Sequence, residues 1–210
     1  MPRRPFRRRR FRRRTRSGYG LARKALREVK KLKHETEFKI HGFSLAETDV
    51  TDTGAVSALA LIAAGDDIGN RDGREAVVKS LQLNGYLRIN PGSATDDAIC
   101  RVMMVWDTDQ SGTIPTVGDV LGTVNLTGIK STNNRKRFVI FYDRVFNLHD
   151  GDNNVKFIKY YKRFNRKINF LGTDATQAHQ GRGCPYLLYF SNVAAGVLKF
   201  KCDAKMYFSE

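Results

Sequence analysis

Apolar and polar side chains alternate along several separate stretches of this chain. The most regular stretch places Leu198, Phe200, Cys202, Ala204, Met206 and Phe208 between Lys199, Lys201, Asp203 and Lys205. A two-residue period is typical of a β-strand with one buried face, because successive side chains point to opposite sides. Such strands can enclose a core only by packing sheet against sheet.

Seven other stretches have strand character, and loops of uneven length separate them. We expect them over 36–45, 55–64, 80–89, 98–106, 137–148, 155–164 and 185–193. The stretch 55–64 is almost wholly apolar, so periodicity leaves a strand and a short helix open. The stretch 98–106 is apolar except for Arg101, which is typical of a strand covered on both faces.

Three details refine this prediction. The apolar set shifts from Phe38 and Ile40 to Phe43 and Leu45, which predicts a bulge at Gly42. We expect a helical turn at 119–121 and a loop over 168–183. Eight strands with uneven loops and no long helix predict an all-β fold with Greek-key connections, for which an eight-stranded jelly-roll sandwich is one solution.

The first sixteen residues cannot join that core. Ten of them are arginine and none is acidic. Residues 1–33 hold twelve Arg, four Lys and one acid (Glu28), so they carry +15 of the net +16 and leave +1 for 34–210. Like charges repel one another and bury little apolar surface, so we expect a disordered arginine-rich arm.

A short basic helix is predicted between the arm and the first strand. Apolar residues recur at helical spacing at Leu21, Ala25, Leu26, Val29 and Leu32, with basic residues on the other faces. A helix of this length is marginal in isolation. We therefore expect two regions: a basic arm and helix over 1–35, and a jelly-roll shell domain over 36–210.

The charge of the arm predicts a polyanionic partner. Each Lys or Arg that neutralises a phosphate releases a counterion, and guanidinium groups bind phosphate oxygens in pairs. Phe6, Phe11 and Tyr19 can stack on unpaired bases. A nuclear-import signal and a membrane-surface patch are alternatives; we expect nucleic acid, with import as a second use and no membrane partner. The predicted nucleic-acid-binding residues are Arg3, Arg4, Arg7, Arg8, Arg9, Arg10, Arg12, Arg13, Arg14, Arg16, Arg23, Lys24, Arg27, Lys30, Lys31 and Lys33.

A second, weaker basic cluster lies among Tyr160, Tyr161 and Phe164. It contains Lys156, Lys159, Lys162, Arg163, Arg166 and Lys167. Cations between aromatic rings suit a groove for single-stranded nucleic acid. Strand alternation, however, turns Lys156 and Lys162 away from Lys159 and Arg163. A nucleic-acid surface and a solvated strand with buried tyrosines both remain open.

No residue pattern indicates catalysis, a cofactor or a metal. The four histidines are isolated, the three cysteines form no C-x-x-C pair, and nucleotide-binding glycine motifs are lacking. The run Asp107-x-Asp109-x-Ser111-Gly112 begins like a calcium loop. Its twelfth position is Gly118 instead of the bidentate glutamate, so we interpret it as a turn, leaving open an ion at subunit contacts. We find no secretory signal, and the longest apolar run is too short to cross a bilayer.

Several short motifs support a family resemblance. They are Asn70-Arg71-Asp72-Gly73-Arg74 leading into Val77-Val78-Lys79-Ser80, then Arg101-Val102-Met103-Met104-Val105-Trp106-Asp107, Gly112-Thr113-Ile114-Pro115-Thr116 and Asp119-Val120-Leu121. With the basic arm, they resemble the capsid proteins of small circular, Rep-encoding single-stranded DNA viruses. The chain is more distantly similar to the coat proteins of satellite tobacco necrosis virus and geminiviruses.

The resemblance implies a single jelly roll of two four-stranded sheets that assembles into a small icosahedral shell, most simply of sixty copies. It also implies an arm that contacts a single-stranded DNA genome, host import receptors as partners, and location in the virion and the host nucleus. The residues themselves leave DNA and RNA, the triangulation number, the host and the receptor-binding loops open. The alternatives are a cellular nucleic-acid-binding protein with a basic disordered tail, and an enzyme targeted by its tail.

Overall fold

The computed structural model describes residues 19–29, 38–93, 97–109, 112–151 and 154–210. The chain divides into two units, Met1–Glu37 and Phe38–Glu210. In the first unit a helix spans 19–29, whereas the predicted disordered stretch over 1–18 lies outside the described residues. No helix in the described part is both long and apolar enough to cross a membrane.

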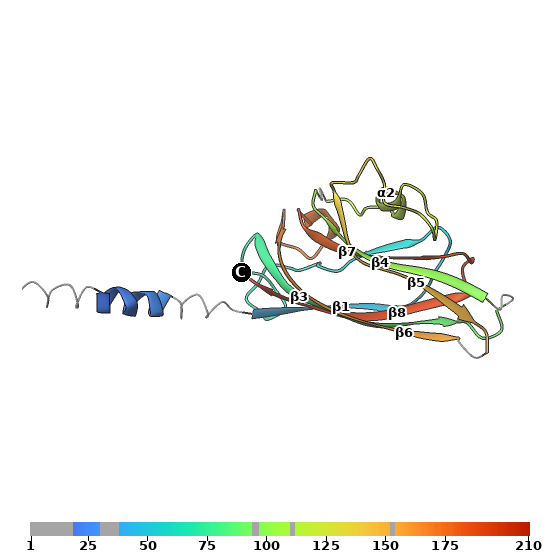
Figure 1. The fold of residues 1–210 in the computed structure, drawn as a ribbon, viewed down its shortest axis with the longest axis horizontal. Coiled ribbons are helices and arrows are strands. Elements are labelled where there is room, and N and C mark those ends of the chain that lie inside the picture. Colours follow the sequence, from blue (N-terminus) through green and yellow to red (C-terminus); the bar gives the residue numbers. More distant parts are fainter. Residues whose placement is uncertain (1–18, 30–37, 94–96, 110–111, 152–153) are drawn as a thin grey trace, which may run out of the picture. The chain divides into compact units, whose positions relative to one another are not determined.

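The described residues of the second unit form eight strands and two short helices (Figure 1). In chain order they are β1 (Phe38–Asp49), β2 (Ala55–Ala58), β3 (Glu75–Ile89), β4 (Asp97–Asp107), α2 (Val117–Leu121), β5 (Phe138–His149), β6 (Val155–Asn169), the 3-10 helix η1 (Gln177–His179), β7 (Cys184–Ser191) and β8 (Leu198–Ser209).

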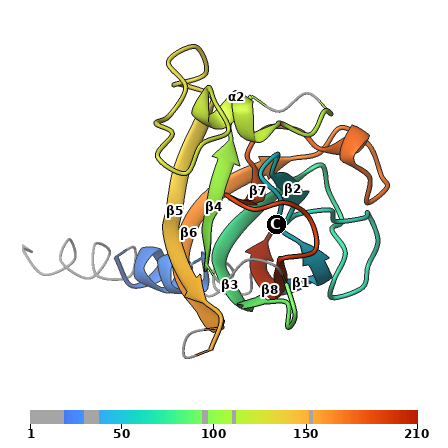
Figure 2. The same ribbon diagram turned by 90° about the vertical axis from the view of Figure 1, so that its right-hand side faces the viewer.

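The strands form two antiparallel four-stranded sheets that lie face to face (Figures 1 and 2). One sheet has the order β1-β8-β3-β6 and the other β2-β7-β4-β5. The chain changes sheet at every connection except that between β4 and β5. This is the two-sheet jelly roll, and the predicted fold class is confirmed.

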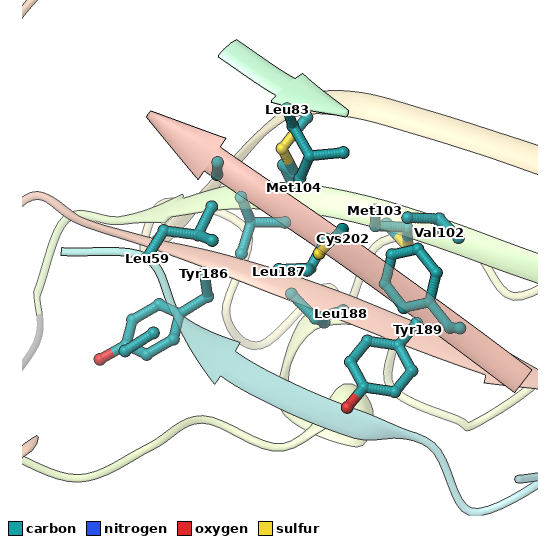
Figure 3. Close-up of a cluster of buried hydrophobic side chains, with 14 of the residues drawn as sticks. Leu59, Leu83, Val102, Met103, Met104, Tyr186, Leu187, Leu188, Tyr189 and Cys202 are labelled. Carbon is teal, nitrogen blue, oxygen red and sulfur yellow. The ribbon is translucent and has the colours of Figure 1, made fainter. Parts of the chain in front are cut away.

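The core lies between the two sheets. The six apolar residues that alternate along β8 are all buried, as predicted. They face buried residues of the opposite sheet, and Figure 3 shows Cys202 and Leu83 beside Met104 and Leu187. β4 and β7 are buried on nearly every residue, because they are the central strands of their sheet and α2 adds the buried Val117, Val120 and Leu121. The prediction of a strand covered on both faces is therefore confirmed for 98–106.

The predicted bulge at Gly42 is wrong. β1 pairs with β8 without interruption from Phe38 to Leu45, and the register shifts only between Leu45 and Thr48. Lys39 lies opposite the buried Phe208 and is itself 1% exposed, whereas Phe38 is 60% exposed. A charged side chain can occupy the core-facing side because Lys39 Nζ lies 2.5 Å from a carboxylate oxygen of Asp72.

The other differences concern the ends of elements. β6 extends to Asn169, so the first two residues of the predicted 168–183 loop belong to a strand, because Ile168 and Asn169 pair with Ala76 and Glu75 of a longer β3. Of the apolar run 55–64, only 55–58 is a strand. The predicted helical turn is present as α2, which begins at Val117 because Thr116 and Asp119 form a capping box.

Arg71 fastens the loop before β3 to the loop after β6. Its side chain is buried, and Nε donates a hydrogen bond to the carbonyl of Ile62 at 3.1 Å. The other guanidinium nitrogens donate to the carbonyls of Gly73 and Gly172, and the group lies 4.2 Å from the ring centroid of Phe170. This geometry gives the arginine of the Asn70–Arg74 motif a structural role.

Candidate nucleic-acid interface

Only three of the predicted arm cations lie in the described part of the chain. Arg23, Lys24 and Arg27 are exposed on the helix over 19–29. Arg23 and Arg27 are four residues apart and therefore lie on the same side of that helix. The remaining arm candidates fall outside the described residues: Arg3, Arg4, Arg7, Arg8, Arg9, Arg10, Arg12, Arg13, Arg14, Arg16, Lys30, Lys31 and Lys33.

The second basic cluster is divided between the two faces of β6. Lys159 and Arg163 lie opposite Asn84 and Ser80 of β3, and Lys167 lies opposite Val77. Lys162 and Arg166 lie opposite the buried Leu81 and Val78, and thus on the other face. The predicted division by strand alternation is confirmed.

Lys162 and Arg166 cover aromatic side chains at the edge of the sandwich. Lys162 Nζ lies 5.6 Å from the ring centroid of Phe164, and the Arg166 guanidinium lies 5.9 Å from that of Trp106. Both distances are within the range of cation–π attraction. These two cations therefore have local packing partners.

Lys159 and Arg163 belong to a larger basic surface, the face of the β1-β8-β3-β6 sheet turned away from the other sheet. We call it the solvent face. β8 contributes Lys199, Lys201, Lys205 and Tyr207, which alternate with its buried residues. β3 contributes Lys79, Gln82, Tyr86 and Arg88, and β1 contributes Phe38 and Ile40.

Carboxylates neutralise only part of this surface. Lys199 pairs with Asp49 at 2.7 Å, Arg88 pairs with Glu47, and Lys167 pairs with Glu75. Within the described residues, five further cations form no ion pair: Lys79, Lys159, Arg163, Lys201 and Lys205. The solvent face therefore keeps a positive charge that is available to a polyanion.

Two hollows lie on the solvent face. The first, which we call the tyrosine hollow, has a volume of about 590 Å³ and is lined by Phe38, Lys79, Ser80, Gln82, Tyr161, Arg163, Phe164 and Tyr207. Arg163 Nε lies 3.4 Å from the Tyr161 hydroxyl oxygen, and this hydrogen bond is the main cause that lowers the pKa of Tyr161. The hollow thus combines aromatic rings with cations.

The second hollow is centred on Gly85 and has a volume of about 290 Å³. A Cβ at Gly85 would lie 2.6 Å from the carbonyl oxygen of Lys201 and 2.7 Å from Cβ of Cys202, so glycine lets β3 and β8 approach here. Tyr86, Phe157, Lys159 and Lys201 are among the lining residues, together with the exposed Asp203. Both hollows therefore combine aromatic rings with cations, and the second also contains a carboxylate.

A larger cavity of about 730 Å³ lies among loops instead of on a sheet. It is lined by Thr108, Asp109, Thr132, Asn133, Asn134, Arg135, Lys136, Arg137 and Arg182. None of these side chains is aromatic, and Arg137 is held by Asp107 through two hydrogen bonds of 2.9 and 2.7 Å. This cavity offers charge and hydrogen bonds but no ring on which a base can stack.

The stretch that begins at Asp107 and resembles the start of a calcium loop has a structural role. The Asp107 carboxylate is fully buried, and the Arg137 guanidinium occupies both of its oxygens. Among the described residues, no group of three or more His, Cys, Asp or Glu side chains converges as metal ligands would. Asp107 therefore serves to fix the start of β5 against the end of β4.

The cysteines are equally inert. All three are buried and free, and burial raises the pKa of the Cys202 thiol to about 12. Burial also raises the pKa of Cys100 and Cys184. A thiol that stays protonated is a poor nucleophile, so these residues act as core side chains.

Sequence reasoning missed several residues of the solvent face. Phe38 was assigned to the core, and Lys79, Lys201, Lys205 and Tyr207 were given no function. The alternation of β8 indicates that three of them share a face, because it turns Lys201, Lys205 and Tyr207 to the same side. Nothing in the sequence indicated that β8 lies between β1 and β3.

The fold and this site define a class before any comparison is made: a jelly-roll domain with a basic arm and a basic sheet face, of the kind found in viral capsids. The chain belongs to the satellite tobacco necrosis virus coat protein family, whose model matches residues 8–209. It is therefore a viral coat protein, a structural component of the virion and not an enzyme. The cellular nucleic-acid-binding protein and the targeted enzyme are set aside on this ground.

Solved structures with a similar course of the chain come from other viruses. Desmodium yellow mottle tymovirus gives a TM-score of 0.38 at 15% identity, with 83% of this chain and 88% of the other covered. Turnip yellow mosaic virus gives a TM-score of 0.38 at 11% identity, with 84% of this chain and 95% of the other covered. The decameric BFDV capsid protein gives a TM-score of 0.29 at 11% identity, with 83% of this chain and 98% of the other covered. No curated protein matches the chain.

Proposed function

We propose that this coat protein assembles into a small closed shell and packages a single-stranded genome through its basic arm. Residues 1–35 are the nucleic-acid-binding region, and residues 36–210 form the wall of the shell. One observation carries the proposal: +15 of the net charge of +16 lies in residues 1–33, next to a nearly neutral coat-protein domain.

The amount of charge suits the packaging of a genome. Sixty copies, the simplest icosahedral number, would bring about 900 positive charges together and offset on the order of a thousand phosphates. Because residues 34–210 carry a net charge of only +1, subunits can meet without strong repulsion once nucleic acid screens the arms. Assembly should therefore depend on both nucleic acid and salt.

The solvent face supports the same function. Lys159, Arg163 and Lys167 lie on it, whereas Lys162 and Arg166 lie on the other face of β6. We assign the first three, together with Lys79, Lys201 and Lys205, to contacts with nucleic acid that the arm has recruited. The face is turned toward the genome in this arrangement.

The arm has a second proposed use as a nuclear-import signal read by host import receptors. Clusters of Lys and Arg of this density serve that purpose in other proteins. A fluorescent protein fused to residues 1–35 is expected to accumulate in the nucleus. The same fusion with the ten arginines of residues 1–16 changed to glutamine is expected to stay distributed through the cell.

The packaging proposal is tested by comparing the full chain with a variant that lacks residues 1–33. Each is mixed with genome-length single-stranded DNA or RNA at low ionic strength, imaged by negative stain and treated with nuclease. The full chain is expected to form closed particles whose nucleic acid is protected. If the truncated chain protects nucleic acid equally well, the arm does not package the genome. Nuclease treatment of copurified nucleic acid identifies it as DNA or RNA.

A further inference from the structure

The tyrosine hollow brings together side chains from all four strands of its sheet. Phe38 comes from β1, Tyr207 from β8, Lys79, Ser80 and Gln82 from β3, and Tyr161 and Arg163 from β6. Register explains the convergence, because Arg163 lies opposite Ser80, which in turn lies opposite Tyr207. The hollow exists only because β8 lies between β1 and β3.

Two of its four aromatic side chains are unusually exposed. Phe38 is 60% and Tyr161 is 58% exposed, although both lie within regular strands. Exposed rings gathered in one concave place mark a binding surface more often than scattered ones. Because exposed rings lie beside cations in this hollow, the ligand that fits is itself flat, aromatic and anionic.

The remaining lining residues suit the other parts of a nucleotide. Arg163 and Lys79 supply positive charge for phosphate, and neither forms an ion pair within the described residues. Gln82 and Ser80 supply donors and acceptors for the edge of a base. The volume of about 590 Å³ lies within the range of small-ligand sites.

The covalent connection of the arm strengthens the inference. Phe38 is the first residue of the shell unit and also lines the hollow. Only residues 34–37 separate the segment that carries +15 from Phe38 along the chain. A strand held by the arm is present near the hollow at a high effective concentration, so a weak stacking site can be occupied.

We propose that the tyrosine hollow binds an unpaired base of the packaged strand by stacking it on Tyr161, Tyr207 and Phe38. This inference rests on the packaging function and adds to it a preference for single-stranded over double-stranded nucleic acid. The arm binds phosphates of single and double strands alike, whereas the hollow requires a base whose faces are free. The shell domain thereby selects single-stranded nucleic acid.

The Gly85 hollow extends the site. Gln82 and Tyr86 are four residues apart on β3, which corresponds to about 13 Å along the strand. A single strand that follows β3 reaches from the tyrosine hollow to Tyr86, Phe157 and Lys159. Lys205 and Lys201 flank this path on β8, opposite Gln82 and Tyr86.

Photo-cross-linking locates the contact directly. The full-length chain is irradiated with an oligothymidylate in which one base is 5-iodouracil, at a salt concentration where light scattering shows no particles, and cross-linked peptides are sequenced. Cross-links at Tyr161, Tyr207 or Phe38 are expected. If cross-links appear only within residues 1–35, or on neither unit, the hollow does not hold a base.

Affinity measurements test the preference. The double variant Tyr161→Leu with Tyr207→Leu is expected to lose at least about five-fold in affinity for the oligothymidylate and little for the matching duplex. Tyr161→Phe keeps the ring and is expected to keep the affinity. Ile129→Ala, at an apolar side chain that is 82% exposed and lines neither hollow, is the control. An equal loss for both ligands, or an equal loss for Ile129→Ala, contradicts the proposal.

Three outcomes separate this inference from the packaging function. If the double variant still packages nucleic acid but no longer prefers single strands, both proposals stand. If the double variant retains the preference while deletion of 1–33 abolishes packaging, the arm proposal stands alone. If the double variant prevents particle formation even without nucleic acid, the hollow is a contact between subunits and the inference is overturned.

Discussion

Three polar side chains on β1 and in the loop before β3 are wholly or partly buried, and each is accommodated differently. Arg71 donates to three backbone carbonyls and stacks on Phe170. Lys39 pairs with Asp72. His41 stays neutral more readily than an exposed histidine, because burial lowers its pKa from 6.5. At the residue scale, the loop before β3 is therefore held by polar contacts as much as by apolar packing.

Replacing Arg71 tests this role. Arg71→Met is expected to lower the free energy of unfolding by about 2–5 kcal/mol, because three backbone carbonyls, in one buried and two partly buried hydrogen bonds, lose their donor. Urea unfolding at high salt, followed by the fluorescence of the single buried Trp106, measures the change. Arg74→Met is the matched control, since Arg74 is exposed and belongs to the same motif. Equal losses in the two variants would show that the buried hydrogen bonds contribute nothing specific.

His41 makes stability depend on pH. Desolvation lowers its pKa in the folded state, while a hydrogen bond to the Gly69 backbone opposes part of the shift. The folded state therefore binds fewer protons than the unfolded chain, so stability is complete above pH 6.5 and falls as pH drops toward the lowered pKa. Thermal melting between pH 7.5 and 5 is expected to show a smaller decrease for His41→Gln than for the natural chain. A parallel decrease in both would assign the pH dependence to other groups.

At the scale of elements, β6 serves two purposes because its two faces differ. It is an edge strand of the β1-β8-β3-β6 sheet, and edge strands need charge to discourage uncontrolled pairing. Lys162 and Arg166 supply that charge while they cover Phe164 and Trp106. Lys159 and Arg163 point to the solvent face, where the two hollows lie.

This division predicts different effects for two lysines three residues apart. Lys159→Gln is expected to reduce the slope of log affinity against log salt for single-stranded DNA by about 0.7, the contribution of one phosphate contact. Lys162→Gln is expected to leave the slope unchanged. Fluorescence anisotropy over a salt series measures both. If both variants change the slope equally, the face on which a cation lies is irrelevant and the arm dominates all binding.

At the scale of the whole molecule, charge and packing are assigned to different parts of the chain. Residues 1–33 carry +15, and those of them that the structure describes, 19–29, are exposed, whereas the buried core of the described chain comes from the second unit. Salt weakens contacts between exposed cations and phosphates far more than it weakens apolar packing. Assembly with nucleic acid and the stability of the shell domain should therefore respond differently to salt.

We expect salt to weaken assembly with nucleic acid while it leaves the stability of the shell domain nearly unchanged. Raising sodium chloride from about 0.1 to about 1 M should abolish particle formation on single-stranded DNA, because the counterion-release contribution is lost. Over the same range the melting temperature of the unassembled protein should change by only a few degrees. Light scattering and calorimetry on the same samples provide the two measurements. Particles that form equally well at both salt concentrations would show that contacts between shell domains drive assembly.

Sequence reasoning predicted the eight strands because alternation is a local property that each stretch displays alone. The predictions from alternation were wrong where a contact with a residue distant in sequence decides which way a side chain points or where a strand ends. Alternation groups Phe38 with the apolar set of its strand, yet Phe38 is exposed and Lys39 is buried, because Asp72 neutralises a lysine on the core-facing side and no local pattern indicates this pairing. It also ended β6 too early, because the residues after Phe164 form a strand only through pairing with Glu75–Val78.

The sequence by itself determined that a cationic segment adjoins a nearly neutral β domain, because charge and two-residue periodicity are local properties that can be read from each stretch alone. Only the tertiary structure decided which side chains share a surface. The order β1-β8-β3-β6 brings residues from positions 38 to 207 into one hollow, and strand order follows from long-range pairing that no short stretch encodes.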